Sequence, residues 1–86
     1  MYDYGRERKR VFTEEGNEMY EQIRGNVVRL LASSGAFTSS AAWKGVTGDS
    51  DLMLACLDRM VELRLLREVT GDEVWGQHRI FVSAVR

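Results

Sequence analysis

The chain has 86 residues, 44% of them hydrophobic and 29% charged, with eight glycines, no proline, and twelve basic against thirteen acidic groups. This length supports one hydrophobic core, and no stretch approaches the roughly 18 consecutive apolar residues of a membrane span. We therefore expect a single soluble domain without a signal peptide or membrane segment. The single cysteine, Cys56, excludes an internal disulfide, which favours a reducing, cytoplasmic setting. A small domain buries little surface, so a homodimer remains an open alternative.

The charge is unevenly distributed along the chain. Four basic side chains crowd into the stretch Arg6–Arg10, so residues 1–12 are predicted to be a flexible basic arm, followed by one folded domain over residues 13–86. Acidic side chains follow the arm, whereas residues 25–48 carry only two charges, both basic.

The first predicted helix begins after Thr13. Apolar residues recur at helical spacing as far as Leu31, which predicts a half-buried helix with Thr13 as its N-cap. Gly35 is placed to end this helix in a left-handed conformation. Ala36-Phe37 is then predicted to be a short bridging strand.

Two more helices are predicted before the spacing of apolar residues changes from that of a helix to that of a strand. Thr38 or Ser39 caps a brief helix that extends through Val46. A longer helix begins at Asp49 or Ser50 and runs to about residue 63. Its inward stripe is predicted to contain Met53, Cys56, Leu57, Met60 and Leu63, and its outward face Asp51, Leu54, Ala55, Asp58, Arg59 and Glu62.

The last third of the chain is predicted to be a β-hairpin. Residues 66–70 alternate with a period of two, and residues 79–85 are rich in β-branched and aromatic side chains. The turn lies either at residues 70–73 or near Gly76-Gln77. In the first case, Val74 and Trp75 also belong to the second strand.

The order helix, short helix, turn, longer helix and hairpin resembles that of a winged helix-turn-helix domain. Residues 37–50 resemble the second helix and turn of this family, and residues 57–69 resemble the end of its recognition helix and the start of its wing. Arg64 departs from the family pattern, which favours glycine there. The resemblance implies a mainly α-helical fold with a C-terminal β-hairpin, and a small DNA-binding protein or transcriptional regulator of the bacterial or phage type.

In this family the third helix usually enters the major groove of DNA, and the wing lies along the backbone or the minor groove. The resemblance therefore implies a double-stranded DNA partner. The candidate DNA-binding residues are Arg6, Arg8, Lys9, Arg10, Lys44, Thr47, Ser50, Arg59, Gln77, His78 and Arg79.

The acidic outward face of the third helix is unfavourable for DNA, because its carboxylates would face phosphates. The alternative is therefore a protein-interaction module or inhibitor that docks on a basic protein partner. Its candidate residues are Asp51, Leu54, Ala55, Asp58, Val61 and Glu62.

Catalysis is not expected. The sequence has no phosphate-binding loop, zinc pattern, nucleophile elbow or paired catalytic carboxylates, so we predict no metal, no cofactor and no enzyme activity. His78 is more consistent with a turn residue than with a catalyst, and Cys56 with a small core residue rather than a redox site.

Overall fold

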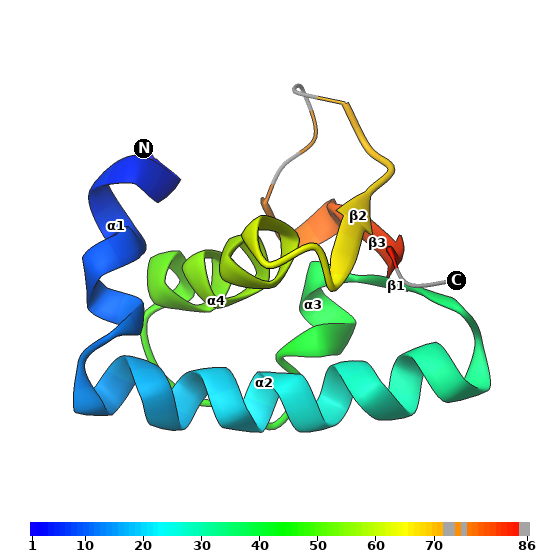
Figure 1. Cartoon of the computed structure of the whole chain (residues 1–86), viewed down its shortest axis with the longest axis horizontal. Coiled ribbons are helices and arrows are strands. Elements are labelled where there is room, and N and C mark those ends of the chain that lie inside the picture. The colour runs from blue at the N-terminus through cyan, green and yellow to red at the C-terminus, as the bar shows by residue number, and fades with distance from the viewer. Residues whose placement is uncertain (72–73, 75, 85–86) are drawn as a thin grey trace.

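The computed structural model describes residues 1–71, 74 and 76–84, and Figure 1 shows the arrangement of their helices and strands. The elements in chain order are α1 (Tyr4–Val11), α2 (Glu14–Ser33), β1 (Ala36–Thr38), α3 (Ser39–Ala42), α4 (Ser50–Glu62), β2 (Leu66–Glu68), the 3-10 helix η1 (Gly76–His78) and β3 (Ile80–Ser83). The long helix α2 forms one side of the molecule, and α1, α4 and the small sheet lie above it in Figure 1. The described part of the chain is thus mainly α-helical with one small antiparallel sheet.

The predicted helix starts are confirmed by side-chain caps. The Oγ1 atom of Thr13 accepts a hydrogen bond of 3.0 Å from the backbone N–H of Gly16 at the start of α2. Thr38 caps α3 in the same way, and Asp49 caps α4 through a 3.0 Å hydrogen bond from the backbone N–H of Asp51. The position of each helix is therefore fixed locally by one short polar side chain.

The second predicted helix is shorter than expected, because α3 ends at Ala42 and not at Val46. The side-chain amide of Asn26, on α2, donates hydrogen bonds of 2.9 and 3.1 Å to the backbone carbonyls of Ala42 and Lys44. These carbonyls are therefore satisfied without a further helical turn. Gly45 then adopts a φ of +80°, which redirects the chain.

The predicted hairpin is confirmed for β2 and β3, which pair antiparallel. The bridging strand β1 joins the other side of β3, so the sheet order is β1-β3-β2. Phe81 of β3 lies opposite Phe37 of β1, with ring centroids 5.7 Å apart.

The hairpin connection differs from both predicted turns. Val74 does not belong to a strand, and residues 76–78 form η1. Trp75, predicted as a strand residue in one alternative, and two residues of the predicted 70–73 turn lie outside the described residues.

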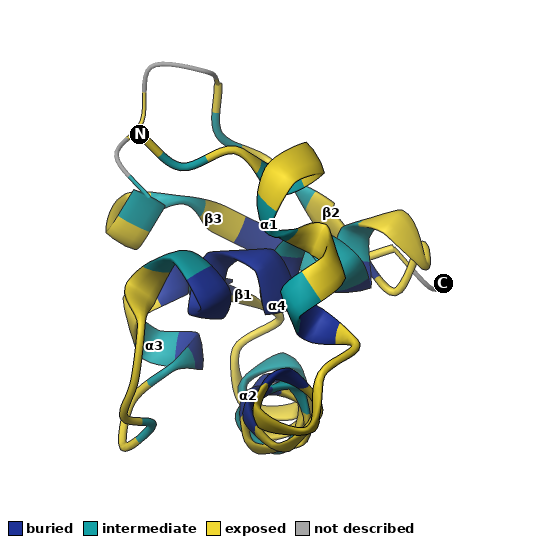
Figure 2. Ribbon diagram, turned by 90° about the vertical axis from the view of Figure 1, so that its left-hand side faces the viewer, coloured by how far each residue is buried: buried dark blue, intermediate teal, exposed yellow. Residues whose placement is uncertain are grey.

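The core lies between α2, α4 and the sheet. Ile23, Leu57 and Phe81 are completely buried, and α4 is buried along most of its length, as the dark colour of this helix in Figure 2 shows. Burial of three large apolar side chains contributes about 1.5–3 kcal/mol each to stability. The predicted inward stripe is confirmed except at its last residue, Leu63, which is exposed.

The predicted flexible arm over residues 1–12 is instead a short helix, α1, packed on the rest of the domain. Val11 at its end is buried in the core. The turn from α1 into α2 requires Gly16, since a β-carbon at this position would lie 1.9 Å from the backbone carbonyl oxygen of Arg10.

Candidate nucleic-acid interface

Helix α1 lies across α4 and is bound to it by polar contacts. The hydroxyl of Tyr2 donates a 2.5 Å hydrogen bond to the carboxylate of Asp58, and the hydroxyl of Tyr4 donates one of 2.7 Å to Glu62. The guanidinium of Arg8 also donates to both oxygens of Glu62, at 3.0 and 2.9 Å. The acidic side of α4 is therefore covered by α1.

The C-terminal end of α1 is tied to the start of α4. The Nη1 atom of Arg10 lies 2.7 Å from the carboxylate of Glu7 and 2.6 Å from that of Asp49, the N-cap of α4. The hydrogen bond from Arg10, followed by the backbone hydrogen bond from Asp51, lowers the pKa of Asp49. The positive charge of Arg10 therefore neutralises the carboxylate of Asp49 at the N-terminus of α4, the end of the helix that an anionic ligand would approach.

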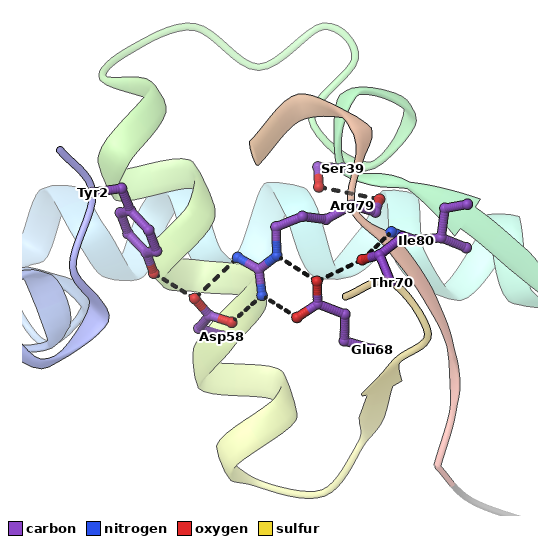
Figure 3. Close-up of polar contacts among 7 residues, drawn as sticks. All are labelled: Tyr2, Ser39, Asp58, Glu68, Thr70, Arg79 and Ile80. Carbon is purple, nitrogen blue, oxygen red and sulfur yellow. Dashed lines mark hydrogen bonds and ion pairs between the residues drawn. The ribbon is translucent and has the colours of Figure 1, made fainter. Parts of the chain in front are cut away.

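Arg79 joins α4, β2 and β3 (Figure 3). Its guanidinium donates hydrogen bonds of 2.6 and 3.2 Å to Asp58, and of 2.9 and 2.8 Å to Glu68. The side chain of Arg79 is only 13% exposed and lies over the ring of Phe81. Arg79 is thus held in internal ion pairs in this structure, and its role in DNA contact stays a prediction.

Hydrogen bonds hold the carboxylate of Glu62 in its charged form. Hydrogen bonds from Tyr4, Arg59 and Arg8 lower the pKa of Glu62 to about 2. Burial raises the pKa of Tyr2, and its hydrogen bond to Asp58 raises it further. The charges of Asp58 and Glu62 are therefore balanced by arginines within the molecule.

Phe12, which follows α1, lies between two guanidinium groups. Arg8 and Arg59 approach its ring with their Cζ atoms 5.1 and 4.9 Å from the centroid. Arg59 also forms a 2.8 Å ion pair with Glu62. Arg8, Arg10, Arg59 and Arg79 all make internal ion pairs, which removes four of the predicted DNA-binding residues from the set of free cations.

The predicted acidic and apolar docking face of α4 is not open. Leu54 and Ala55, predicted to point outward, are 6% and 0% exposed, so that prediction is wrong. Leu54 packs beside Gly76 of η1, where a β-carbon would come within 2.7 Å of it. The other candidate residues of this face are either half-buried, as Asp51, Asp58 and Val61 are, or exposed but paired, as Glu62 is.

Six of the other predicted residues, which we call the polar face, lie on α1, the α3–α4 connection, the start of α4 and η1: Arg6, Lys9, Thr47, Ser50, Gln77 and His78. All six are exposed. In Figure 2, η1, the start of α4 and the α3–α4 connection lie along the left edge, and the helix α1 lies to the right of them. Ser50 and Gln77 line one shallow depression of about 280 Å³.

The polar face has few internal contacts. Arg6 is 62% exposed on its side chain, donates a 2.6 Å hydrogen bond to the backbone carbonyl of Met1, and lies 3.7 Å from Glu7, a long contact for an ion pair. Within the described residues, the side chains of Lys9, Thr47 and Ser50 make no hydrogen bond or ion pair, and Gln77 contacts only His78, at 3.2 Å. These side chains are therefore available to a ligand.

Lys44 does not belong to the polar face. It lines a different depression, between α2 and α3, together with Arg29. Lys44 is therefore an exposed predicted DNA contact that lies outside the polar face.

Tyr2 and Tyr4, which fix α1 on α4, were not among the residues predicted from the sequence. Their signal in the sequence is weak: Tyr4 and Val11 are seven residues apart, a helical spacing that marks the buried side of α1. The basic residues between them conceal this pattern.

The described residues contain no group of three or more metal-ligating side chains of the histidine, cysteine, aspartate and glutamate types. No helix within the described residues has the length and apolar character needed to cross a membrane. Comparisons with protein-family models, curated protein sequences and solved structures find no match to this chain.

Proposed function

We propose that this chain is a winged helix-turn-helix domain that binds double-stranded DNA, mainly through the phosphate backbone. The element order α2, β1, α3, α4, β2, β3 supports the proposal, with α3 and α4 as the helix-turn-helix and the β2–β3 hairpin as the wing. The 3-10 helix η1 lies within this wing and contacts α3.

The proposal rests on the contrast between basic residues that pair with carboxylates inside the molecule and basic residues that are exposed. The arginines that approach α4 neutralise its carboxylates, whereas Lys9 of the polar face makes no ion pair within the described residues and Arg6 is largely exposed, with a hydrogen bond to the backbone of Met1. A phosphate backbone that approaches the polar face therefore meets two exposed cations, Arg6 and Lys9, and the hydroxyl and amide groups of the turn and wing.

Helix α4 lacks the row of exposed side chains with which a recognition helix contacts base edges in the major groove. Among its residues only Ser50 at the start and Glu62 at the end are exposed, and Glu62 is paired with Arg8 and Arg59. Base readout needs several side chains that reach base edges. We therefore infer a binding mode with little sequence preference and a strong dependence on salt.

The test is duplex binding by fluorescence anisotropy at about 50 and 200 mM salt, where each phosphate contact changes the salt slope by about one unit. Replacing Arg6 and Lys9 together by alanine should weaken binding several-fold and reduce the slope by about two. The matched control replaces Arg24 and Arg67, two exposed arginines outside the polar face. Absence of saturable binding at the lower salt concentration contradicts the proposal, as does an equal loss in both double variants.

A basic protein partner is the second candidate, favoured by the acidic side chains beneath α1. Docking on Asp58 and Glu62 requires α1 to leave α4, because Tyr2, Tyr4 and Arg8 occupy both carboxylates. Deletion of residues 1–12 therefore discriminates the two functions. It should weaken DNA binding under the first proposal and strengthen capture of a basic partner under the second.

A further inference from the structure

A second depression lies between α2 and α3, on residues that the polar face does not include. It has a volume of about 290 Å³ and is lined by Asn26, Arg29, Leu30, Ser33, Ala41 and Lys44. Polar and basic side chains stand beside two apolar ones, Leu30 and Ala41. This combination of groups suits an anion that carries a small apolar portion.

Arg29 is held in place without a carboxylate partner. Its Nη2 atom donates a hydrogen bond to the side-chain oxygen of Asn26. The amide nitrogen of Asn26 is itself fixed by the carbonyls of Ala42 and Lys44 at the end of α3. One asparagine thus orients the guanidinium and secures the helix end beside it.

The lack of a counter-ion separates Arg29 from most arginines in the described part of the chain. Arg8, Arg10, Arg24, Arg59 and Arg79 each lie within 2.9 Å of a carboxylate oxygen. Residues 25–48 contain no aspartate or glutamate at all, and their two charges are those of Arg29 and Lys44. Both of these side chains line the same depression, so its charge is uncompensated locally.

We propose that this depression is a binding site for the phosphate group of a phosphate ester. The guanidinium of Arg29 offers a fork of donors that suits phosphate oxygens, and the ammonium of Lys44 adds a second positive charge. Leu30 and Ala41 contact the carbon skeleton of the ester. The site is independent of the proposed DNA contact, since it shares no residue with the polar face.

Titration with inorganic phosphate, followed by the backbone amide signals in NMR at constant ionic strength, tests the site. We expect saturable shifts at Asn26, Arg29, Ser33 and Lys44, with chloride at the same ionic strength giving none. Arg29→Gln and Lys44→Gln should each weaken binding at least five-fold. Arg67→Gln removes another exposed arginine, on β2, that makes no ion pair within the described residues, and it should leave binding unchanged. Shifts that do not saturate, or that survive Arg29→Gln and Lys44→Gln in folded protein, overturn the proposal.

Lys44→Gln keeps the test valid if Arg29→Gln disturbs folding, because the side chain of Lys44 makes no hydrogen bond within the described residues. Two further ligands identify the source of the phosphate. A short DNA duplex that shifts the same amides at lower concentration than a mononucleotide assigns the site to a nucleic-acid backbone. The reverse order assigns it to a free phosphorylated compound. If neither ligand nor inorganic phosphate shifts these amides, the site does not exist, whether or not the polar face binds DNA.

Discussion

Arg79, directly before β3, and Asp58 of α4 form a two-point ion pair, with the shorter contact at 2.6 Å and both side chains at most 15% exposed. Arg79→Met should lower the free energy of unfolding by about 2–4 kcal/mol, because it leaves two carboxylates, those of Asp58 and Glu68, without their partner in a partly buried place. Urea unfolding measures this loss. In a double-mutant cycle, Asp58→Asn should cost clearly less in the Arg79→Met background than in the parent, and strictly additive effects would contradict the pairing.

Deletion of residues 1–12 should destabilise the domain, in contrast to what a flexible arm would do. The deletion removes the buried side chain of Val11 and leaves Asp58 and Glu62 without their tyrosine donors. We expect a loss of at least about 2 kcal/mol, which corresponds to about 8–16 °C in Tm for a domain of this size. Calorimetry provides the measurement, and an unchanged Tm would mean that α1 is detached in solution.

Stability should fall in acid because of Glu62. Its pKa is about 2 in the folded protein against an ordinary value of 4.5, so the unfolded chain binds more protons between these values. The contribution of this carboxylate is complete above about pH 4.5 and is lost as the pH falls toward 2. Glu62→Gln should flatten the stability profile in this window, measured by urea unfolding at several pH values. Glu18→Gln, which changes the net charge equally on the outer side of α2, should give a profile parallel to that of the parent.

Arg64→Gly should stabilise the protein. Arg64 has a φ of +63° directly after α4, a conformation that costs a residue with a β-carbon about 1–2 kcal/mol. Glycine removes this cost but has greater freedom in the unfolded chain, so we expect a net gain of about 0.5–1 kcal/mol. Arg64→Ala is the matched control, because alanine removes the charge but retains the β-carbon. A gain of the same size with alanine would refute the conformational explanation.

Cys56 should resist thiol reagents in the native protein. The side chain is completely buried, and burial raises the pKa of its thiol to about 12, so almost no thiolate exists at neutral pH. Iodoacetamide should therefore label it only after unfolding, as mass spectrometry can show. Rapid labelling of folded protein would indicate that α2 and α4 separate frequently, since the thiol faces the backbone carbonyl of Gly16.

The helices could be predicted from the sequence because their signals are local. The caps Thr13 and Asp49 lie within three residues of the groups that they bind, and the buried stripe of α4 repeats at helical spacing. The hairpin strands were predictable for the same reason.

The arrangement of α1 was not predictable in this way. Tyr2 and Tyr4 find their partners 56 and 58 residues away, and nothing in the local sequence indicates which carboxylates they meet. The error in the outward face of α4 has the same origin, because Leu54 and Ala55 are covered by elements distant in sequence. Likewise, composition alone could not divide the basic residues into those that are paired and those that are free.

The position of β3 between β1 and β2 has a consequence for folding kinetics. Within the described residues the two outer strands pair only with β3, so neither has a strand partner until β3 is in place. Ala36 pairs with Val82, far along the chain, whereas Leu66 pairs with Ser83 at a shorter separation, so closing the hairpin costs less chain entropy than adding β1. We therefore expect the hairpin to form first and β1 to dock late, at a rate governed by contact order rather than by helix formation.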